Sequence, residues 1–588
     1  MPEPNPPHTA LSWADQNSES DAVVPDGTTL LDVTGELASI PPPVPADKDP
    51  MATYYCKTLR SVADKTYDVV IVGGGAVGVA VLDRLLHNKG KRALSVLVLE
   101  KGGFLLPEHV QNLDPRYQRL MMDAVARPWL AKNSGAHSFD LAPQIPYLGG
   151  RAQFWSTWIP QPTEAQMPTW PDKVKKEIAG YWNSARQYLG AVLPSAMGPQ
   201  FTKLQPVLVK RLKDGLDKTV FNPDIQATGY EVELACRDTT STLGFRKFSP
   251  VPRLIAATQN HPVHVDIVTG CEVQEIRHKK DTTGEKLHRA TELATTQGVL
   301  KLGKDTKLVL ANGIVEPTGL LQRSFADVLP DFTGTNLGGH VASWFSARVP
   351  RDAWPESKEG DELQIGCLYL RGQVTVESNK RDFHIHLMVV SNPKPGSSEA
   401  DLYRLIPDSF DQEFLKQLAS KDHIGFMVHT LGEWRSQPQD QKGSRVYVDH
   451  DTTVLDFAPS KTDLAVRTQM DLAAQDLVKK VLAKDHASKI EYWRPSTDGK
   501  PGEWQKDIPG TRLKDALVHE SGTLWMGEDP KNSVTDLDCR LHTVSNVYVG
   551  GAATFPTSGS WNPTLAAVAL AQRMADTLLP PANGGGNG

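Results

Sequence analysis

Three glycines near the start of the chain have the spacing of a nucleotide-binding turn. In the stretch YDVVIVGGGAVGVAVLDRLL, Gly73, Gly75 and Gly78 follow a strand-like run and open a helix-like one, and Glu100 ends the next predicted strand, SVLVLE. In such a βαβ unit the first glycine permits a tight turn, the second lets a pyrophosphate approach the backbone, and the third allows close helix packing. Amides at the start of the helix favour negative phosphates, and Glu100 would accept hydrogen bonds from ribose hydroxyls.

The alternative is a glycine-rich turn that packs a strand on a helix and binds no ligand. We favour the nucleotide site because the strand, the helix and the acidic residue are all in place. The turn by itself does not distinguish NAD from FAD, since both dinucleotides use the same fingerprint. Residues elsewhere in the chain must decide between them.

Length and composition narrow the class of protein. A chain of 588 residues exceeds the size of a single core, so we expect two or more substructures. The formal net charge is -6, and Lys and Arg are scattered rather than gathered in a basic stripe, which argues against a nucleic-acid partner. The five cysteines lack CxxC spacing and indicate neither a zinc site nor a disulfide framework.

The chain shows no pattern typical of a membrane or secreted protein. The first twenty residues have no basic cluster followed by an apolar run, and glycines and prolines interrupt the longest uncharged span, residues 547–572. The Asn-x-Thr triplet that begins at Asn562 has proline at its centre, which blocks glycosylation. We therefore expect no membrane partner and an intracellular, cytoplasmic location.

Strand-like runs rich in β-branched residues alternate with helical patterns, which indicates an α/β protein. Inside it, the runs FHIHLMVV, IGFMVHTL and SRVYVD look instead like antiparallel strands. Nucleotide-type strands occur before and after that region, so we predict a discontinuous nucleotide domain of residues 66–150, 243–340 and 508–580. The predicted substrate domain comprises residues 151–242 and 341–507. Residues 1–65 are predicted to form an extended or disordered arm, and residues 581–588 a flexible tail.

Several later segments resemble the glucose-methanol-choline (GMC) flavin oxidoreductases. HESGTLWMG, residues 519–527, is similar to the family's His-x-x-Gly-Thr-x-x-Met-Gly stretch, and YLGGRAQFWSTWIP, residues 147–160, resembles the loop that lies over the flavin. VYVGGAATFPTSGSWNPTLAAVALAQRMADTLL, residues 547–579, resembles the closing strand and helix, with a spacing most similar to the pyranose-oxidase branch. TKLVLANGIVEPTGLLQRS and GTNLGGHVASWF resemble the middle elements, so the resemblance extends from Tyr67 to Leu579.

This resemblance implies FAD, bound in an extended form across a discontinuous Rossmann-type domain. It also implies a second domain with an antiparallel sheet and helices, as in GMC and glutathione-reductase-like folds. This domain would cover the flavin and supply the substrate cavity. The cofactor contacts that it implies are Gly73, Gly75, Ala76, Gly78, Glu100, Gly150, Ser156, Val273, Gly551, Ala552, Asn562 and Thr564.

The activity that the resemblance implies is oxidation of an alcohol, either a sugar or a hydroxylated small metabolite, by hydride transfer to flavin N5. His519 would be the base for the hydroxyl proton and Asn562 would orient the hydroxyl, because an amide cannot take the proton. O2 or a quinone-like acceptor would reoxidise the flavin. Asn562 also has a structural interpretation, as the residue that starts a helix before Pro563.

Two details depart from the family or from a functional interpretation. Phe154 stands where pyranose oxidases carry a histidine bonded to FAD, and phenylalanine has no nucleophilic nitrogen, so we predict non-covalent FAD. Ser156 stands in the place of a threonine near flavin N5. His384 and His386 share one strand face in FHIHLMVV, but no third metal ligand appears nearby, so we interpret both as structural.

Other functions remain open at this point. A flavin-containing lyase, such as the family's hydroxynitrile lyases, would use His519 as acid and base without net redox turnover. An NAD(P)-dependent dehydrogenase would use only the glycine turn. In a non-catalytic binding module, His519, Asn562 and the glycine turn would be present only for packing reasons. The sequence indicates neither the oligomeric state nor the choice between oxidase and dehydrogenase.

Overall fold

The computed structural model describes residues 49–582 with internal gaps. The gaps are residues 91, 114–128, 134–139, 142–143, 217–220, 222–225, 239–244, 260–263, 282–287, 356–361, 377, 408–417, 419, 436–442, 496–500 and 509–515. No helix of the described residues combines the length and the apolar character that crossing a membrane requires.

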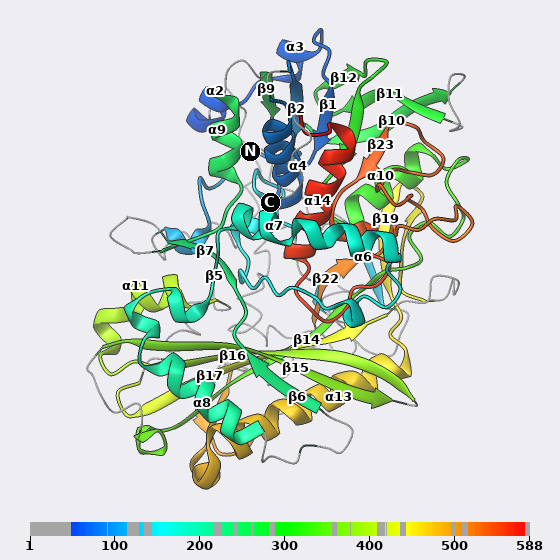
Figure 1. Ribbon diagram of the computed structural model, residues 1–588. Helices are drawn as coiled ribbons and strands as arrows, with labels where there is room; N and C mark the ends of the chain where they lie inside the picture. Colours follow the sequence, from blue (N-terminus) through cyan, green and yellow to red (C-terminus); the bar gives the residue numbers. More distant parts are fainter. Residues whose placement is uncertain are drawn as a thin grey trace, which may run out of the picture.

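Five of the described strands form a parallel sheet in the order β23-β13-β1-β2-β9. The strands are β1 Val69–Val72, β2 Ser95–Leu99, β9 His264–Val268, β13 Lys307–Leu310 and β23 Val547–Val549. Almost all their residues are buried, as in a parallel sheet covered on both faces. The last strand comes from the far end of the chain, so the Rossmann-type domain is assembled from distant segments (Figure 1).

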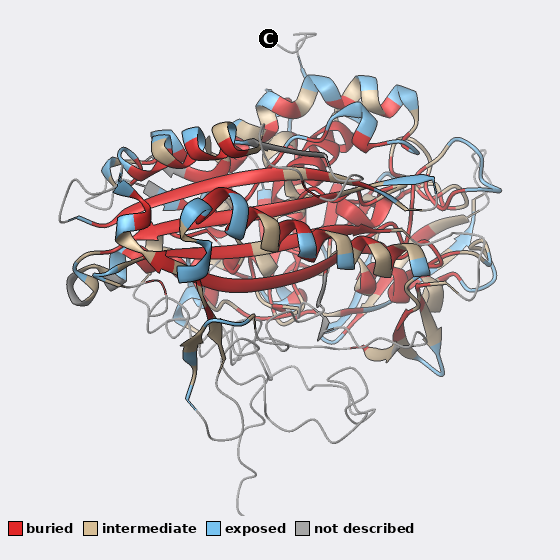
Figure 2. Ribbon diagram, turned by 90° about the horizontal axis from the view of Figure 1, so that it is seen from below, coloured by how far each residue is buried: buried red, intermediate tan, exposed pale blue. Residues whose placement is uncertain are grey.

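The second sheet is mainly antiparallel, and the structure describes nine of its strands. Its main path runs β21-β20-β14-β17-β16-β15-β6, with β22 beside β14 and β4 beside β22. The strands are β4 Asp140–Leu141, β6 Gln226–Tyr230, β14 Gly338–Pro350, β15 Gln364–Val376, β16 Asn379–Ser391, β17 His423–Trp434, β20 Glu491–Arg494, β21 Glu503–Gln505 and β22 Ala516–Ser521. Its four long strands are mostly buried, with helices lying across the sheet (Figure 2).

Helices cover both sheets. Helix α4 Ala76–Asn88 and helix α14 Thr564–Leu578 pack against each other beside the parallel sheet, and α8 Leu204–Leu216 and α13 Lys461–Asp476 pack on the antiparallel sheet (Figure 1). The other α-helices are α2 Pro50–Tyr55, α3 Leu59–Val62, α6 Asp172–Ile178, α7 Trp182–Leu189, α9 Val251–Thr258, α10 Val315–Ser324 and α11 Pro395–Leu405.

Short helices and three small sheets complete the described elements. The short helices are η1 Val110–Asn112, η2 Gly150–Gln153, η3 Glu164–Gln166, η4 Ala179–Tyr181, η5 Pro194–Ala196, η6 Pro199–Phe201, η7 Arg351–Ala353, η9 Leu477–Leu482, η10 Lys484–Lys489 and η12 Gly551–Thr554. The small sheets are formed by β10 Val273–Lys280, β11 His288–Thr295 and β12 Gly298–Lys301; by β3 Leu130–Asn133, β18 Arg445–Asp449 and β19 Thr452–Phe457; and by β5 Ala191–Val192, β7 Leu234–Asp238 and β8 Phe245–Lys247.

The structure differs from the sequence analysis at the predicted N-terminal arm. Residues 1–48 lie outside the described residues, but residues 50–62 carry helices α2 and α3 rather than an extended arm. Leu59 and Val62 are buried among apolar side chains of the parallel-sheet domain. Burial of these side chains overrides the proline-rich local composition.

A second difference concerns the segment that contains His519. The sequence analysis assigns residues 508–580 to the nucleotide domain, whereas β22 pairs with β14 of the antiparallel sheet. The register places Val518 opposite His340. The residue predicted to be the base therefore belongs to the sheet that was predicted to supply the substrate cavity.

Asp576 holds helix α14 to its neighbours. Its carboxylate accepts hydrogen bonds from Arg84, Asn88 and Tyr181 at 2.6–2.8 Å. Burial on its own would raise the pKa of Asp576, but these donors outweigh burial and hold the pKa below its usual value of 3.8. Replacement of Asp576 by alanine should lower the free energy of unfolding by about 2–3 kcal/mol, because the charged Arg84 and the neutral donors Asn88 and Tyr181 lose their acceptor.

The depressed pKa also sets the pH dependence of this contribution. The contribution of ionised Asp576 to the free energy of unfolding is fully present above the unfolded-state pKa of 3.8, and it is lost as the pH falls through the lower folded-state pKa. Thermal unfolding followed by circular dichroism should show the difference between wild type and Asp576→Ala at neutral pH, and the difference should shrink in acid. Asp172→Ala is the control, because Asp172 is a fully exposed surface carboxylate and its loss should leave the midpoint unchanged.

Candidate active site

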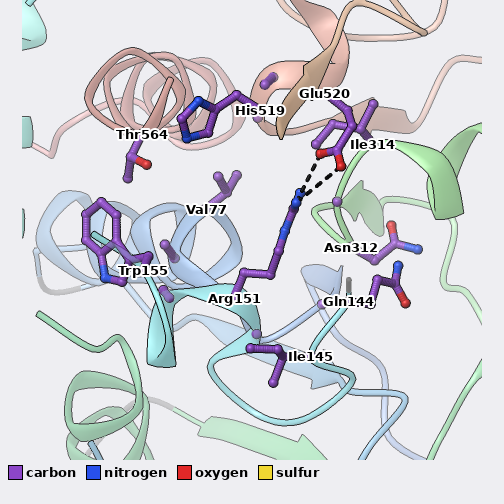
Figure 3. Close-up of a pocket in the computed structure, with 18 of the residues that line it drawn as sticks. Val77, Gln144, Ile145, Arg151, Trp155, Asn312, Ile314, His519, Glu520 and Thr564 are labelled. Carbon is purple, nitrogen blue, oxygen red and sulfur yellow. Dashed lines mark hydrogen bonds and ion pairs between the residues drawn. The ribbon is translucent and has the colours of Figure 1, made fainter. Parts of the chain in front are cut away.

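One cavity of about 390 Å³ joins the glycine turn to the antiparallel sheet. It opens at the carboxyl ends of β1, β2 and β13, where open α/β sheets bind their ligands. One region is lined by Gly73, Gly75, Glu100 and Val273. The cavity continues to strands of the antiparallel sheet, at Trp344, His386, His429 and His519, and to loops and helix starts, at Gly150, Ser156, Gly551, Ala552, Asn562 and Thr564. Figure 3 shows part of this lining.

The three glycines of the turn have different structural roles. Gly73 has φ +103°, and a Cβ there would lie 2.7 Å from the carbonyl oxygen of Ala311. A Cβ at Gly78 would lie 2.1 Å from the carbonyl oxygen of Gly73. Fold and packing therefore require glycine at these two positions, whether or not a ligand binds.

Gly75 is different because the backbone conformation does not require glycine there. Its φ is -81°, and among the described residues a Cβ would meet only the carbonyl oxygen of Gly149, at 3.8 Å. The side chain that glycine omits would stand in the cavity at the start of α4. This space, beside open helix amides, fits a dinucleotide pyrophosphate.

Glu100 supports the turn from the end of β2. Its carboxylate accepts hydrogen bonds from the backbone nitrogens of Gly74, at 2.9 Å, and Gly102, at 3.2 Å. Burial raises the pKa of Glu100, and these two hydrogen bonds oppose that rise. The side chain also lines the cavity, so it both braces the turn and can accept from a ligand hydroxyl.

The structure brings together most of the residues singled out from the sequence. Twelve of the predicted site residues line the cavity: Gly73, Gly75, Ala76, Glu100, Gly150, Ser156, Val273, His519, Gly551, Ala552, Asn562 and Thr564. Gly78 does not line it, because this residue lies inside α4 and packs against the turn.

His519 lies in β22 with φ +58°, a left-handed conformation that non-glycine residues seldom adopt. Its Nδ1 lies 2.9 Å from Nδ1 of His340 on β14, and the two rings meet edge to face. Burial, followed by the nearby His340, His386 and Arg151, lowers the pKa of His519 well below its ordinary value of 6.5. The imidazole is therefore neutral at neutral pH and can accept a proton.

Asn562 precedes helix α14 and is held by the antiparallel sheet. Its Oδ1 accepts a hydrogen bond from the Tyr369 hydroxyl at 3.1 Å and lies 3.0 Å from Nε2 of His386. Helix α14 begins at Thr564 with Pro563 as its N-cap, so a helix starts directly after Asn562, as expected. The Asn562 side-chain oxygen itself contacts the antiparallel sheet.

The two histidines of β16 lie differently with respect to the cavity. His386 lines the cavity and contacts Asn562, while Nδ1 of His384 lies 2.6 Å from Oγ of Ser560. Within the described part of the chain no group of three or more metal-ligating side chains is found. The alternation in FHIHLMVV placed both histidines on one face, but the sequence did not reveal that this face turns toward the cavity.

Sequence reasoning missed an ion pair inside the site. Nη1 of Arg151, in η2, lies 3.0 Å from Oε2 of Glu520, next to His519 (Figure 3). The Glu520 side chain is 3% exposed and that of Arg151 is 39% exposed. The positive charge of Arg151 helps to keep His519 neutral. Because 369 positions separate the two residues, no local pattern could have indicated this contact.

Phe154 follows η2 and borders the cavity. Its ring packs with Leu106, Val110 and Ile145 in a small apolar cluster. The loop that carries it also brings Trp155 to the cavity, and the Trp155 indole nitrogen donates to the carbonyl oxygen of Phe248. Phe154 and Trp155 thus provide an apolar wall at this part of the site.

Comparison with known proteins shows a family similarity in the C-terminal part of the chain. Residues 440–571 match the family profile of the GMC oxidoreductase C-terminal domain. The match covers 132 of the 588 residues, so it shows that this segment is similar to the GMC oxidoreductases. The match does not single out the pyranose-oxidase branch.

Individual proteins are similar to this chain over different lengths. The 6'''-hydroxyparomomycin C oxidase of Streptomyces lividus is 24% identical over 563 residues, which cover 88% of this chain and 92% of that protein. The fructose dehydrogenase large subunit of Gluconobacter japonicus is 43% identical over 61 residues, only 10% of this chain and 11% of that protein. The structure of pyridoxine 4-oxidase from Mesorbium loti superposes with a TM-score of 0.53 at 15% identity, covering 87% of this chain and 99% of the other, and shows the same fold.

Proposed function

We propose that the protein is an FAD-dependent oxidoreductase that oxidises the CH–OH group of a small molecule. The observation that carries this proposal is the single cavity that joins the glycine turn to the His519–Asn562 pair. The family match supports flavin chemistry, and two similar proteins are named as oxidases, of 6'''-hydroxyparomomycin C and of pyridoxine.

The residues of the turn would hold the ADP half of FAD, and those near the antiparallel sheet would hold the flavin. Gly75 would leave room for the pyrophosphate, Glu100 would accept from the ribose, and Val273 would border the adenine. Gly150, Ser156, Gly551, Ala552 and Thr564 would contact the remaining cofactor. When bound, FAD supplies the acceptor for a hydride from the substrate carbon.

His519 and Asn562 would act on the substrate hydroxyl. His519 is neutral at neutral pH and lines the cavity, so its ring can take the hydroxyl proton as the carbon is oxidised. Asn562 would orient the hydroxyl by a hydrogen bond, because its amide has no proton-accepting nitrogen. Sugars and hydroxylated small metabolites are the substrate classes that we propose, with O2 or a quinone-like molecule as the electron acceptor.

The experiment that tests this function is anaerobic titration of the purified protein with a panel of sugars and alcohols. Bleaching of the flavin absorbance by one of them, followed by recovery with O2 or a quinone, is the expected result. If the protein is yellow, shows lyase activity and is bleached by no member of the panel, the function is that of a lyase. If the purified protein is colourless and NAD(P) activates it, the cofactor is NAD(P) and not FAD.

Non-covalent attachment of the cofactor is a separate prediction. Phe154 offers no nucleophilic atom for a bond to the flavin, so acid precipitation should release the yellow chromophore into the supernatant. Phe154→Leu keeps an apolar side chain and should release it equally. A chromophore that stays with the wild-type pellet, and with a single peptide after digestion, would contradict non-covalent binding.

A further inference from the structure

Three side chains on long strands of the antiparallel sheet reach the two residues of the proposed catalytic pair. His340 on β14 meets His519, while Tyr369 on β15 and His386 on β16 meet Asn562. All three are buried, with exposed fractions of 3% or less. We call His340, Tyr369 and His386 the sheet trio.

The hydrogen bonds at Asn562 determine which end of its amide is free. The side-chain oxygen can only accept, and it receives the Tyr369 hydroxyl. His386 also faces this oxygen through Nε2, so that nitrogen must carry the proton. With its oxygen engaged on the side of the sheet, Asn562 has its NH2 group left to offer to the cavity that it lines.

The contact between His340 and His519 is equally directional. Two Nδ1 atoms at 2.9 Å share one proton, so one ring donates and the other accepts. His340 is neutral, because burial lowers its pKa to about 3. Nε2 of His340 has no hydrogen-bond partner among the described residues. The base role proposed for His519 needs an unprotonated Nε2 in His519, so the proton of the neutral His519 ring lies on its Nδ1, and Nδ1 of His340 accepts it.

We propose that the sheet trio sets the hydrogen-bonding polarity of the catalytic pair. His340 accepts from Nδ1 of His519 and leaves Nε2 of His519 without a proton, while Tyr369 and His386 turn the NH2 group of Asn562 toward the cavity. The catalytic consequence rests on the proposed function. There, the substrate O–H bond breaks, its proton passes to Nε2 of His519, and the oxygen that gains charge accepts from Asn562.

This arrangement makes the trio positioning residues, since none of them needs to touch the reacting atoms. A ring nitrogen that is already protonated cannot act as a base, and an amide turned by 180° would present an acceptor to the developing negative charge. The charged and titratable groups that face His519 are His340, His386, Arg151 and Glu520.

The first test reads the tautomer directly in holoenzyme labelled with 15N-histidine. The Nε2 signal of His519, identified by its loss in His519→Gln, should have the shift of an unprotonated imidazole nitrogen in wild type. His340→Phe removes the acceptor and should move this signal toward the average of two tautomers. His340→Asn keeps an acceptor oxygen near the position of Nδ1 and should restore the wild-type shift. A protonated Nε2 in wild type, or no change in His340→Phe, would overturn the proposal, and the wild-type measurement decides even if His340→Phe does not fold.

Kinetics provide the second test. His340→Phe should reduce flavin on the order of 10-fold more slowly than wild type, less than the about 10²- to 10⁴-fold effect of losing the base, and His340→Asn should recover most of the rate. Asn562→Asp keeps the acceptor for Tyr369 and His386 but removes the NH2 group, so its reduction rate should also fall. A wild-type rate in Asn562→Asp would overturn the orientation of the amide.

These results separate the two proposals. Wild-type flavin reduction by His519→Ala would remove the proposed base, whatever the 15N shifts show. An inactive His519→Ala together with a protonated Nε2 in wild type would show that the reaction requires His519 and would remove the role of the trio.

Discussion

Replacement of His519 by alanine should slow flavin reduction by about 10²- to 10⁴-fold, the contribution of a positioned general base. The flavin should stay bound, because the glycine turn and Glu100 lie at the other end of the cavity. Stopped-flow mixing of the oxidised variant with a substrate that bleaches the wild type, under anaerobic conditions, measures the rate constant directly. His450→Ala is the matched control, because His450 has an exposed side chain that is not part of the cavity lining and should keep the wild-type rate.

The pH profile of the wild type tests the same residue. Burial and the neighbouring His340, His386 and Arg151 lower the pKa of His519 well below 6.5. The neutral base is then present at and above pH 6.5, so the reduction rate should be flat there and fall only in more acidic solution, as the ring gains a proton. A fall in rate already centred near 6.5 or above would contradict the lowered pKa, and a wild-type rate in His519→Ala would remove the base.

Gly75→Val should lower the affinity for FAD by about 10- to 100-fold, because its branched side chain would occupy the space left for the pyrophosphate and overpacking costs about 1–3 kcal/mol. The variant should still fold, since the backbone at residue 75 has φ -81° and a Cβ has room. Fluorescence titration of the apoprotein with FAD measures the dissociation constant. Thermal unfolding of the apoprotein shows whether folding is retained.

Side chains of increasing size at residue 75 distinguish an effect on FAD binding from an effect on folding. Gly75→Ala adds one methyl group and should weaken FAD binding less than Gly75→Val, with both apoproteins near the wild-type midpoint. Gly78→Ala should behave differently, because its Cβ would lie 2.1 Å from the carbonyl oxygen of Gly73 and the loss should appear in apoprotein stability. Wild-type FAD affinity in Gly75→Val would show that the pyrophosphate lies elsewhere.

Some of the site could be predicted because its causes are local. The turn follows β1 directly, Gly73 needs its positive φ within that turn, and Gly78 packs one helical turn later, so the whole feature fits in six residues. Glu100 ends the neighbouring strand β2. The second sheet was also foreseeable from the alternation of its strands, whereas the helices of residues 50–62 were not, because they depend on a core built from other segments.

The sequence by itself thus determined the glycine turn, its acidic partner and the two-sheet character of the chain, all of which follow from neighbours and short periods. Only the tertiary structure decided that β22 runs beside β14, so that His519 meets a residue 179 positions away, and that His386 reaches Asn562 across 176 positions. Such contacts depend on the pairing and register of long strands, and shifting a strand by one residue would turn each side chain to the other face. Local composition does not encode that register, so the environment of the proposed catalytic pair became visible only in the assembled fold.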